Sequence, residues 1–321
     1  MAQFLFARFW SGLMTLFCVA VIVFIIVRVI PGDAAMMLTG AGAGVVSEQE
    51  LEAVRERLGI NQPLPVQFVA WVGDFVRFDL GTSIRTGAPV ADEIAARFPY
   101  TLQIAVMAMV IAVVLGVPAG VLAARFTGSW IDRLLQTLSV AGLAAPSFWV
   151  GLLIILSLVT FFRWSAPLFW EPFWVSPIQS ITQLIWPAIA AGLRQLALIA
   201  RMTRSIMLEV LGEDYIRTAR AKGLSEARVI FRHGLTNGSL PIVTLIGFEF
   251  AALFGSLIIT ETVFNVPGLG QYVITAIMNR DYPAAQAVVL LLAGIVVIGN
   301  LLVDLIYGWL DPRMRLKGKP S

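Results

Sequence analysis

The chain has 321 residues, of which 58% are hydrophobic and 13% are charged, with a formal net charge of +3 at pH 7. Soluble domains contain roughly 45–50% apolar and about 25% charged residues, so this composition excludes a soluble globular protein. We therefore expect an integral membrane protein in contact with lipid. Its small net charge gives no reason to expect a nucleic-acid partner.

Six stretches approach the length of about 20 apolar residues that a helix needs to cross a bilayer. In chain order they are 9–27, 99–124, part of 134–162, part of 178–202, 240–262 and 283–310. The first follows Arg8 as in a signal peptide, but its 19 uncharged residues are too long for the usual apolar region, which favours a retained helix. The pattern predicts an all-α membrane protein with six transmembrane helices, in one domain covering residues 1–321.

Six spans place both termini on one side of the membrane, and the distribution of lysine and arginine indicates which side. The loops on the side of the termini carry 14 basic residues, and the opposite loops carry eight. The termini are therefore predicted to be cytoplasmic. Residues 31–98 become an extracytoplasmic insert between the first two spans, and residues 203–238 become a cytoplasmic segment.

Catalytic groups are scarce in this sequence. It contains one histidine, His233, and one cysteine, Cys18, so the usual zinc and nucleophile constellations are missing. It also lacks the glycine-rich P-loop of nucleotide-binding proteins. We expect a transport protein rather than an enzyme, with no cofactor bound by this chain.

The cytoplasmic segment contains a compact basic stretch that predicts a helix, a glycine turn and a second helix. Glu213 or Asp214 can cap a helix that continues through Ala221. Gly223 can supply a left-handed stop, and Ser225 can cap the helix that leads into the fifth span. Two interpretations stay open at this point: a solvated loop whose charges only fix topology, or a docking element for a soluble partner.

The stretch "DYIRTARAKGLSEARVIFRHGLTNGSLP" (214–241) resembles the cytoplasmic signature of binding-protein-dependent ABC importer permeases. It is most similar to the first permease subunit of the dipeptide, oligopeptide and nickel group. Further stretches agree along the chain, among them "RVIPGDAA", "FDLGTSIRTGAPV", "APSFWVG", "ETVFNVPGLG" and "NLLVDLIYGWLDPRMR". With Gly223 in register, the chain departs from the broad permease pattern, because Arg217 occupies the glutamate position and the proline is delayed to Pro241.

This resemblance implies the type I ABC importer permease fold in a bacterial inner membrane. It also implies a second homologous permease, one or two ATP-binding subunits that hold ATP and magnesium, and an extracytoplasmic substrate-binding protein. The basic stretch would be the coupling helix that receives the ATPase. The positions carried over to that role are Asp214, Tyr215, Arg217, Thr218, Ala219, Lys222, Gly223 and Leu224.

Ionisable residues inside membrane spans are candidates for function. Arg194 could reach the interface or attract a substrate carboxylate, and Glu249 could face the path or pack against a neighbouring helix. Asp304, four residues after Asn300, is expected to make a polar contact between helices. Glu261 precedes "VFNVPGLG", a candidate external gate. The full set of path or gate candidates is Arg194, Glu249, Glu261, Pro267, Gly268 and Asp304.

The cargo implied by the resemblance is a dipeptide or oligopeptide. Nickel chelates, glutathione and other small solutes are alternatives. An ATP-independent channel or secondary transporter is a further alternative from hydropathy alone, but the inverted repeats and paired broken helices of many such proteins are not evident.

Overall fold

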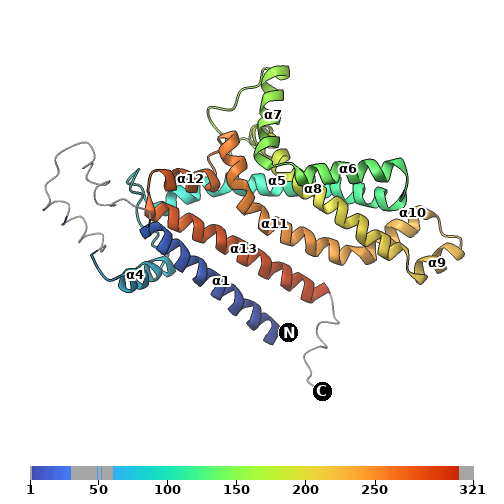
Figure 1. The fold of residues 1–321 in the computed structure, drawn as a ribbon, viewed down its shortest axis with the longest axis horizontal. Helices are drawn as coiled ribbons and strands as arrows, with labels where there is room; N and C mark the ends of the chain where they lie inside the picture. The colour runs from blue at the N-terminus through green and yellow to red at the C-terminus, as the bar shows by residue number, and fades with distance from the viewer. Residues whose placement is uncertain (1, 30–48, 50–51, 53–60, 311–321) are drawn as a thin grey trace.

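The structure is a computed structural model that describes residues 2–29, 49, 52 and 61–310. Much of the first half of the predicted insert, and the basic residues between 313 and 319, lie outside the described residues. The described chain is predominantly helical (Figure 1). Its elements are α1 (Ala2–Val29), α4 (Leu64–Val76), α5 (Val90–Arg125), α6 (Trp130–Ala144), α7 (Ser147–Phe162), α8 (Pro177–Leu211), α9 (Asp214–Ala221), α10 (Glu226–Arg228), a π-helical segment (Val229–Leu235), α11 (Thr236–Phe264), α12 (Leu269–Met278) and α13 (Tyr282–Leu310).

Within the described residues, five helices are long and apolar enough to cross a membrane, and a sixth span is present if α6 and α7 are counted together. These two helices are bent by 104° relative to each other, which corrects the expectation of a continuous third span. Pro146 causes the break, because it has no N–H to donate and it holds Ala145 in an extended conformation, with φ −72° and ψ 124°. As a result α7 projects away from the helix bundle (Figure 1).

Two of the spans are longer than their apolar stretches. Helix α5 begins nine residues before the predicted start, so Pro99 lies inside the helix, and Asp92 and Glu93 occupy the first turn, where they favour the helix dipole. Helix α8 continues past Met202 to Leu211. Both helices therefore extend beyond the apolar residues of their spans.

Helices α5 and α8 form the most extensive helix pair in the molecule. Small residues allow their backbones to approach closely. A Cβ atom on Gly120 would lie 2.5 Å from the carbonyl oxygen of Ala200, and one on Gly192 would lie 2.7 Å from that of Ala108. Close backbone contact through glycine and alanine is the usual way that membrane helices gain packing energy without help from the hydrophobic effect.

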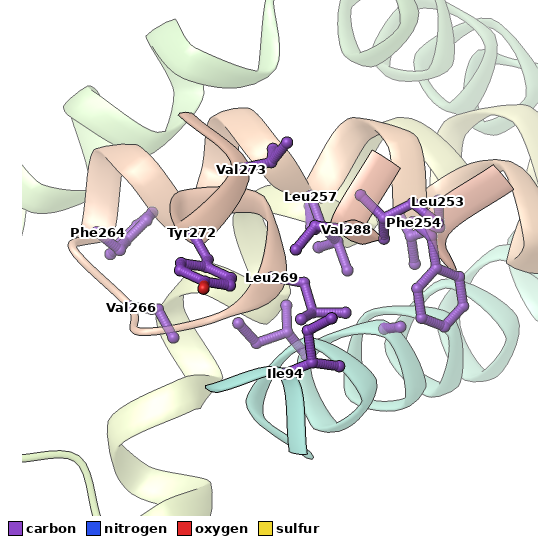
Figure 2. Close-up of a cluster of buried hydrophobic side chains, with 14 of the residues drawn as sticks. Ile94, Leu253, Phe254, Leu257, Phe264, Val266, Leu269, Tyr272, Val273 and Val288 are labelled. Atoms are coloured by element: carbon purple, nitrogen blue, oxygen red, sulfur yellow. The ribbon is translucent and has the colours of Figure 1, made fainter. Parts of the chain in front are cut away.

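The largest cluster of buried apolar side chains joins α11, α12 and α13 to the first half of α5. Figure 2 shows Leu257, Leu269 and Val288 facing one another between these helices, with Ile94 of α5 next to Leu269 and with Phe264 further away, on the side of Tyr272 and Val266. The short helix α12 thereby closes one end of the bundle.

Helix α1 runs beside α13 (Figure 1). Arg8 of α1 and Asp304 of α13 form an ion pair, with 3.2 Å between Nε and Oδ2. Near the other end of α1, Phe24 packs edge-on against Phe68 of α4 with ring centroids 5.1 Å apart. The helix of the insert is therefore attached to the first span.

The loop before α5 is also fixed in place. The hydroxyl group of Ser83 donates to the carboxylate of Asp281, and the amide of Ile84 donates to the other carboxylate oxygen at 3.0 Å. Both Ser83 and Asp281 are buried. This contact connects the end of the insert to the turn between α12 and α13.

Candidate functional site

Helix α9 is a separate two-turn helix at the end of the molecule opposite to α4 (Figure 1). Ile216 and Ala219 lie on its buried side and pack against Val229 of the π-helical segment. Leu211 and Leu224 lie against the same small cluster. The helix is therefore held to the body of the protein by its apolar side.

The helix begins and ends much as its sequence predicts. Glu213 occupies the N-cap position. The predicted side-chain cap is wrong, because neither Glu213 nor Asp214 makes a side-chain capping bond. Instead, the backbone carbonyl of Glu213 accepts hydrogen bonds from the amides of Ile216 and Arg217. Gly223 adopts the predicted left-handed conformation with φ +77°, and its amide donates to the carbonyl of Arg220 at 2.9 Å.

Contacts across the glycine turn hold the two short helices together. The Nε of Arg220 in α9 donates to the Oε1 of Glu226 in α10 at 2.8 Å. The Nδ2 of Asn237 donates to the hydroxyl oxygen of Tyr215 at 3.1 Å, which connects α9 to the start of α11. Ser225 precedes α10 as expected, although its side chain makes no capping bond.

The predicted coupling positions divide between two sides of the helix. Tyr215, Arg217 and Thr218 are exposed, as are Asp214, Lys222 and Gly223. Ala219 is buried and Leu224 is half-buried, so these two residues support the helix from below. The exposed side contains one internal ion pair, between Arg217 and Asp214 at 3.2 Å, while Lys222 has no ion pair with any described residue.

A buried ion pair at the same end of the molecule was missed by the sequence reasoning. The guanidinium of Arg204 in α8 binds the carboxylate of Asp132 in α6 through two hydrogen bonds, of 2.7 and 2.8 Å. The same carboxylate accepts from the amide of Gly128 and from Gln136, both at 2.9 Å. The Asp132 side chain is 3% exposed, so this contact fixes the loop between α5 and α6 to the helix that leads into α9.

We expect Asp132→Asn to lower the free energy of unfolding by about 2–3 kcal/mol, because an amide removes the charge and leaves Arg204 without its bidentate partner. The thermal midpoint of the purified protein in mild detergent would measure this change. Asp74→Asn is the matched control: Asp74 pairs with Arg77 at 4.0 Å with its side chain 56% exposed, and should cost under about 1 kcal/mol. Equal losses in the two variants would contradict the assigned importance of the buried pair.

Glu261 lies inside the protein, at the end of α11. Its Oε1 accepts from the hydroxyl of Thr101 at 2.7 Å, and its Oε2 accepts from the amides of Gly270 and Gln271 at 2.7 and 3.1 Å. The carboxylate thus binds the N-terminus of α12, where the exposed amides of a helix attract negative charge. Gly268, the N-cap of α12, lies directly against the same carboxylate.

Pro267 is half-buried between Val266 and Gly268 in this turn. The group of Glu261, Pro267 and Gly268 is therefore a packed junction between α11 and α12. Its predicted role as a gate stays a prediction.

The remaining path candidates lie apart from one another. Arg194 is exposed on α8 and forms no ion pair or hydrogen bond with any described residue. Glu249 is half-buried on α11 and likewise has no such partner among the described residues. Asp304 makes the predicted polar contact between helices, with Arg8 as its partner.

Comparison with known proteins identifies the family. Residues 116–316 match the binding-protein-dependent transport system inner membrane component, and residues 1–105 match the N-terminal region of such membrane components. The chain belongs to this family. It is a multi-pass permease component of an ABC importer, as the sequence resemblance predicts, and not a catalytic subunit.

Two relatives are similar to the permease over almost its whole length. A probable peptide ABC transporter permease protein of Sinorhizobium fredii is 41% identical over an alignment of 326 positions. The alignment covers 98% of this permease and 100% of the relative. A glutathione transport system permease protein of Escherichia coli K12 is 40% identical over 317 residues, which cover 99% and 100% of the two chains.

Proposed function

We propose that the permease forms half of the translocation path of an ATP-driven importer and that α9 docks on a separate ATP-hydrolysing subunit. The observation that carries this proposal is the two-sided character of α9. Its apolar side is anchored by Ile216 and Ala219, while Tyr215, Arg217 and Lys222 are exposed at the end of the molecule. A solvated loop that only fixed membrane topology would need neither the anchor nor the fixed glycine turn.

The connections of α9 suit the transmission of force. Only two residues, Gly212 and Glu213, separate it from α8, a helix of 35 residues. On its other side, α10 and the π-helical segment continue into α11, and the contact between Asn237 and Tyr215 closes the loop. A displacement of α9 by a partner would therefore move α8 and α11 directly.

The proposed assembly contains a second homologous permease, one or two ATP-binding subunits and an extracytoplasmic substrate-binding protein. ATP and magnesium would be held by the ATP-binding subunits, and this permease would bind no cofactor. Both termini would be cytoplasmic, on the side of α9. The excess of basic residues in the loops on that side supports this orientation.

We propose dipeptides or oligopeptides as the cargo, and the relative from Sinorhizobium fredii, a probable peptide permease, supports this choice. Glutathione is the second candidate, because a relative of comparable identity is a glutathione permease. Both candidates are short peptides with free carboxylates.

The test is to purify the permease from its native membrane in mild detergent, identify the accompanying chains by mass spectrometry and measure ATP hydrolysis. We expect a second permease and an ATP-binding subunit, with hydrolysis stimulated by the added binding protein. Recovery of this chain alone, without ATP hydrolysis, would overturn the proposal in favour of a channel or secondary carrier.

A further inference from the structure

A cavity of about 340 Å³ lies at the bend between α6 and α7. It is bounded by the turn at Ala145, Pro146 and Ser147, by α8, and by α11. Three elements that are far apart in the sequence thus meet around one space. The volume is within the range of small-molecule sites, roughly 300–1,000 Å³.

The polar lining of this cavity is incompletely satisfied. Gln195 is 2% exposed, and its Oε1 has no hydrogen-bond partner among the described residues. A buried acceptor without a partner is costly and requires an explanation, such as a bound ligand that donates a hydrogen bond to it. Ser256 and Thr260 of α11 add two hydroxyl groups to the lining.

The charge of the lining is positive. Arg194 is its one charged residue, and no ion pair or hydrogen bond with a described residue occupies its guanidinium. Arg194 lies seven residues before Arg201, or about 10 Å along α8, within the apolar part of the helix. An arginine in such a place usually has a partner or faces a water-filled cavity.

The N-terminus of α7 adds to the attraction for anions. Ser147 is the first residue of this 16-residue helix and lines the cavity. The amides of the first helical turn have no acceptor within the helix, and the helix dipole places positive potential there. The bend at Pro146 therefore does more than redirect the chain, because it brings a helix N-terminus to the cavity that Arg194 borders.

We propose that this cavity binds a carboxylate of the cargo during passage, with Arg194 as the pairing cation and the Oε1 of Gln195 as the acceptor for an N–H group of the cargo. The inference rests on the proposed function, since it assumes that the cargo is a peptide or glutathione. It adds a selection step within the membrane for solutes with a carboxylate. Arg194 and Gln195 are adjacent in the sequence, so α8 presents the charge and the amide to the same space.

The test is ATP-driven uptake into proteoliposomes that contain the complete importer and its binding protein. The probes are a dipeptide, a tripeptide and glutathione with free carboxylates, together with the C-terminal amides of the two peptides. In Arg194→Gln, uptake of the free acids should fall at least about tenfold, the scale of one lost charge-assisted hydrogen bond. The preference of the permease for acid over amide should also disappear. The binding protein is the same for the wild type and for Arg194→Gln, so it cannot cause this difference.

Arg201→Gln is the matched control, because Arg201 is also an exposed arginine of α8 but does not line the cavity. It should retain uptake and the preference for the acid. Normal uptake by Arg194→Gln, or equal losses in both variants, would overturn the carboxylate site. Loss of the second permease from purified Arg194→Gln would also overturn it, because Arg194 would then be an assembly contact. If the wild-type importer takes up none of the probes, the peptide cargo itself is wrong and the site falls with it.

Discussion

Gly268→Ala is expected to lower the free energy of unfolding of the permease by about 3–5 kcal/mol. A Cβ atom at this position would overlap the carboxylate of Glu261. Glu261 is fully buried and cannot turn toward solvent. The added methyl group would cause overpacking, at about 1–3 kcal/mol, and would displace an acceptor that serves three donors.

Glu261→Ala tests the same junction by removing the acceptor instead of adding bulk. The hydroxyl of Thr101 and the amides of Gly270 and Gln271 would lose their common partner. Each unsatisfied buried donor costs about 1–3 kcal/mol, so we expect a loss similar to that of Gly268→Ala. Agreement between the two variants would show that the contact between α11 and α12 is the common cause.

The measurement is the thermal midpoint in detergent, with expression level in the membrane as a second readout. Gly255→Ala is the control, since Gly255 lies in α11 with no atom within 4 Å of an added Cβ. Alanine there should be neutral or stabilise the helix by up to about 1 kcal/mol. A Gly268→Ala variant as stable as Gly255→Ala would refute the proposed packing of the junction.

The backbone course of the coupling segment, although not its side-chain capping bonds, could be predicted from its sequence because neighbouring residues determine it. The left-handed conformation of Gly223 follows from its place after a short helix, and the structure confirms it with φ +77°. The apolar length of each span similarly predicts which parts of the chain are helical. Interactions within a few residues are accessible to sequence reasoning.

Contacts between distant residues could not be predicted in the same way. Asp132 and Arg204 are 72 positions apart, and Thr101 and Glu261 are 160 positions apart. Nothing in the local pattern of either pair identifies the partner. The sequence therefore marked Glu261 as a charged residue near a gate, whereas the structure places it inside a junction between helices.

The bend at Pro146 is an intermediate case. The proline is visible in the sequence, and its effect on the preceding residue is general. However, prolines also occur inside helices that continue, such as Pro118 in α5 and Pro187 in α8. Which proline breaks a span depends on the packing around it, and this is why the cavity beside Arg194 could be recognised only in the structure.

The two ends of the molecule differ in how firmly they are fixed, and this bears on coupling. At the end near α12, backbone amides donate hydrogen bonds to the buried carboxylates of Glu261 and Asp281 and so fix short elements to the spans. At the opposite end, α9 is held by the small cluster around Ile216, by its glycine turn, and by exposed hydrogen bonds from Arg220 to Glu226 and from Asn237 to Tyr215. An element with few buried contacts can be displaced at lower free-energy cost, as a docking helix requires.

Gly223→Val is expected to reduce ATP-driven uptake at least tenfold and to weaken retention of the ATP-binding subunit during purification. A residue with a side chain adopts the left-handed conformation of Gly223 only at a free-energy cost of about 2 kcal/mol. A β-branched residue such as valine is especially unsuited to it. The open space around this position excludes a steric clash as the cause. The turn would therefore change its backbone conformation, and α9 would lose its fixed direction relative to α10.

Gly87→Val separates coupling from general stability. Gly87 also has a left-handed φ, of +71°, with no atom within 4 Å of an added Cβ, but it lies in the loop before α5, away from α9. Both variants should lose similar thermal stability, whereas only Gly223→Val should release the ATP-binding subunit. Normal uptake and assembly in Gly223→Val, or equal release in both variants, would show that α9 is not the coupling helix.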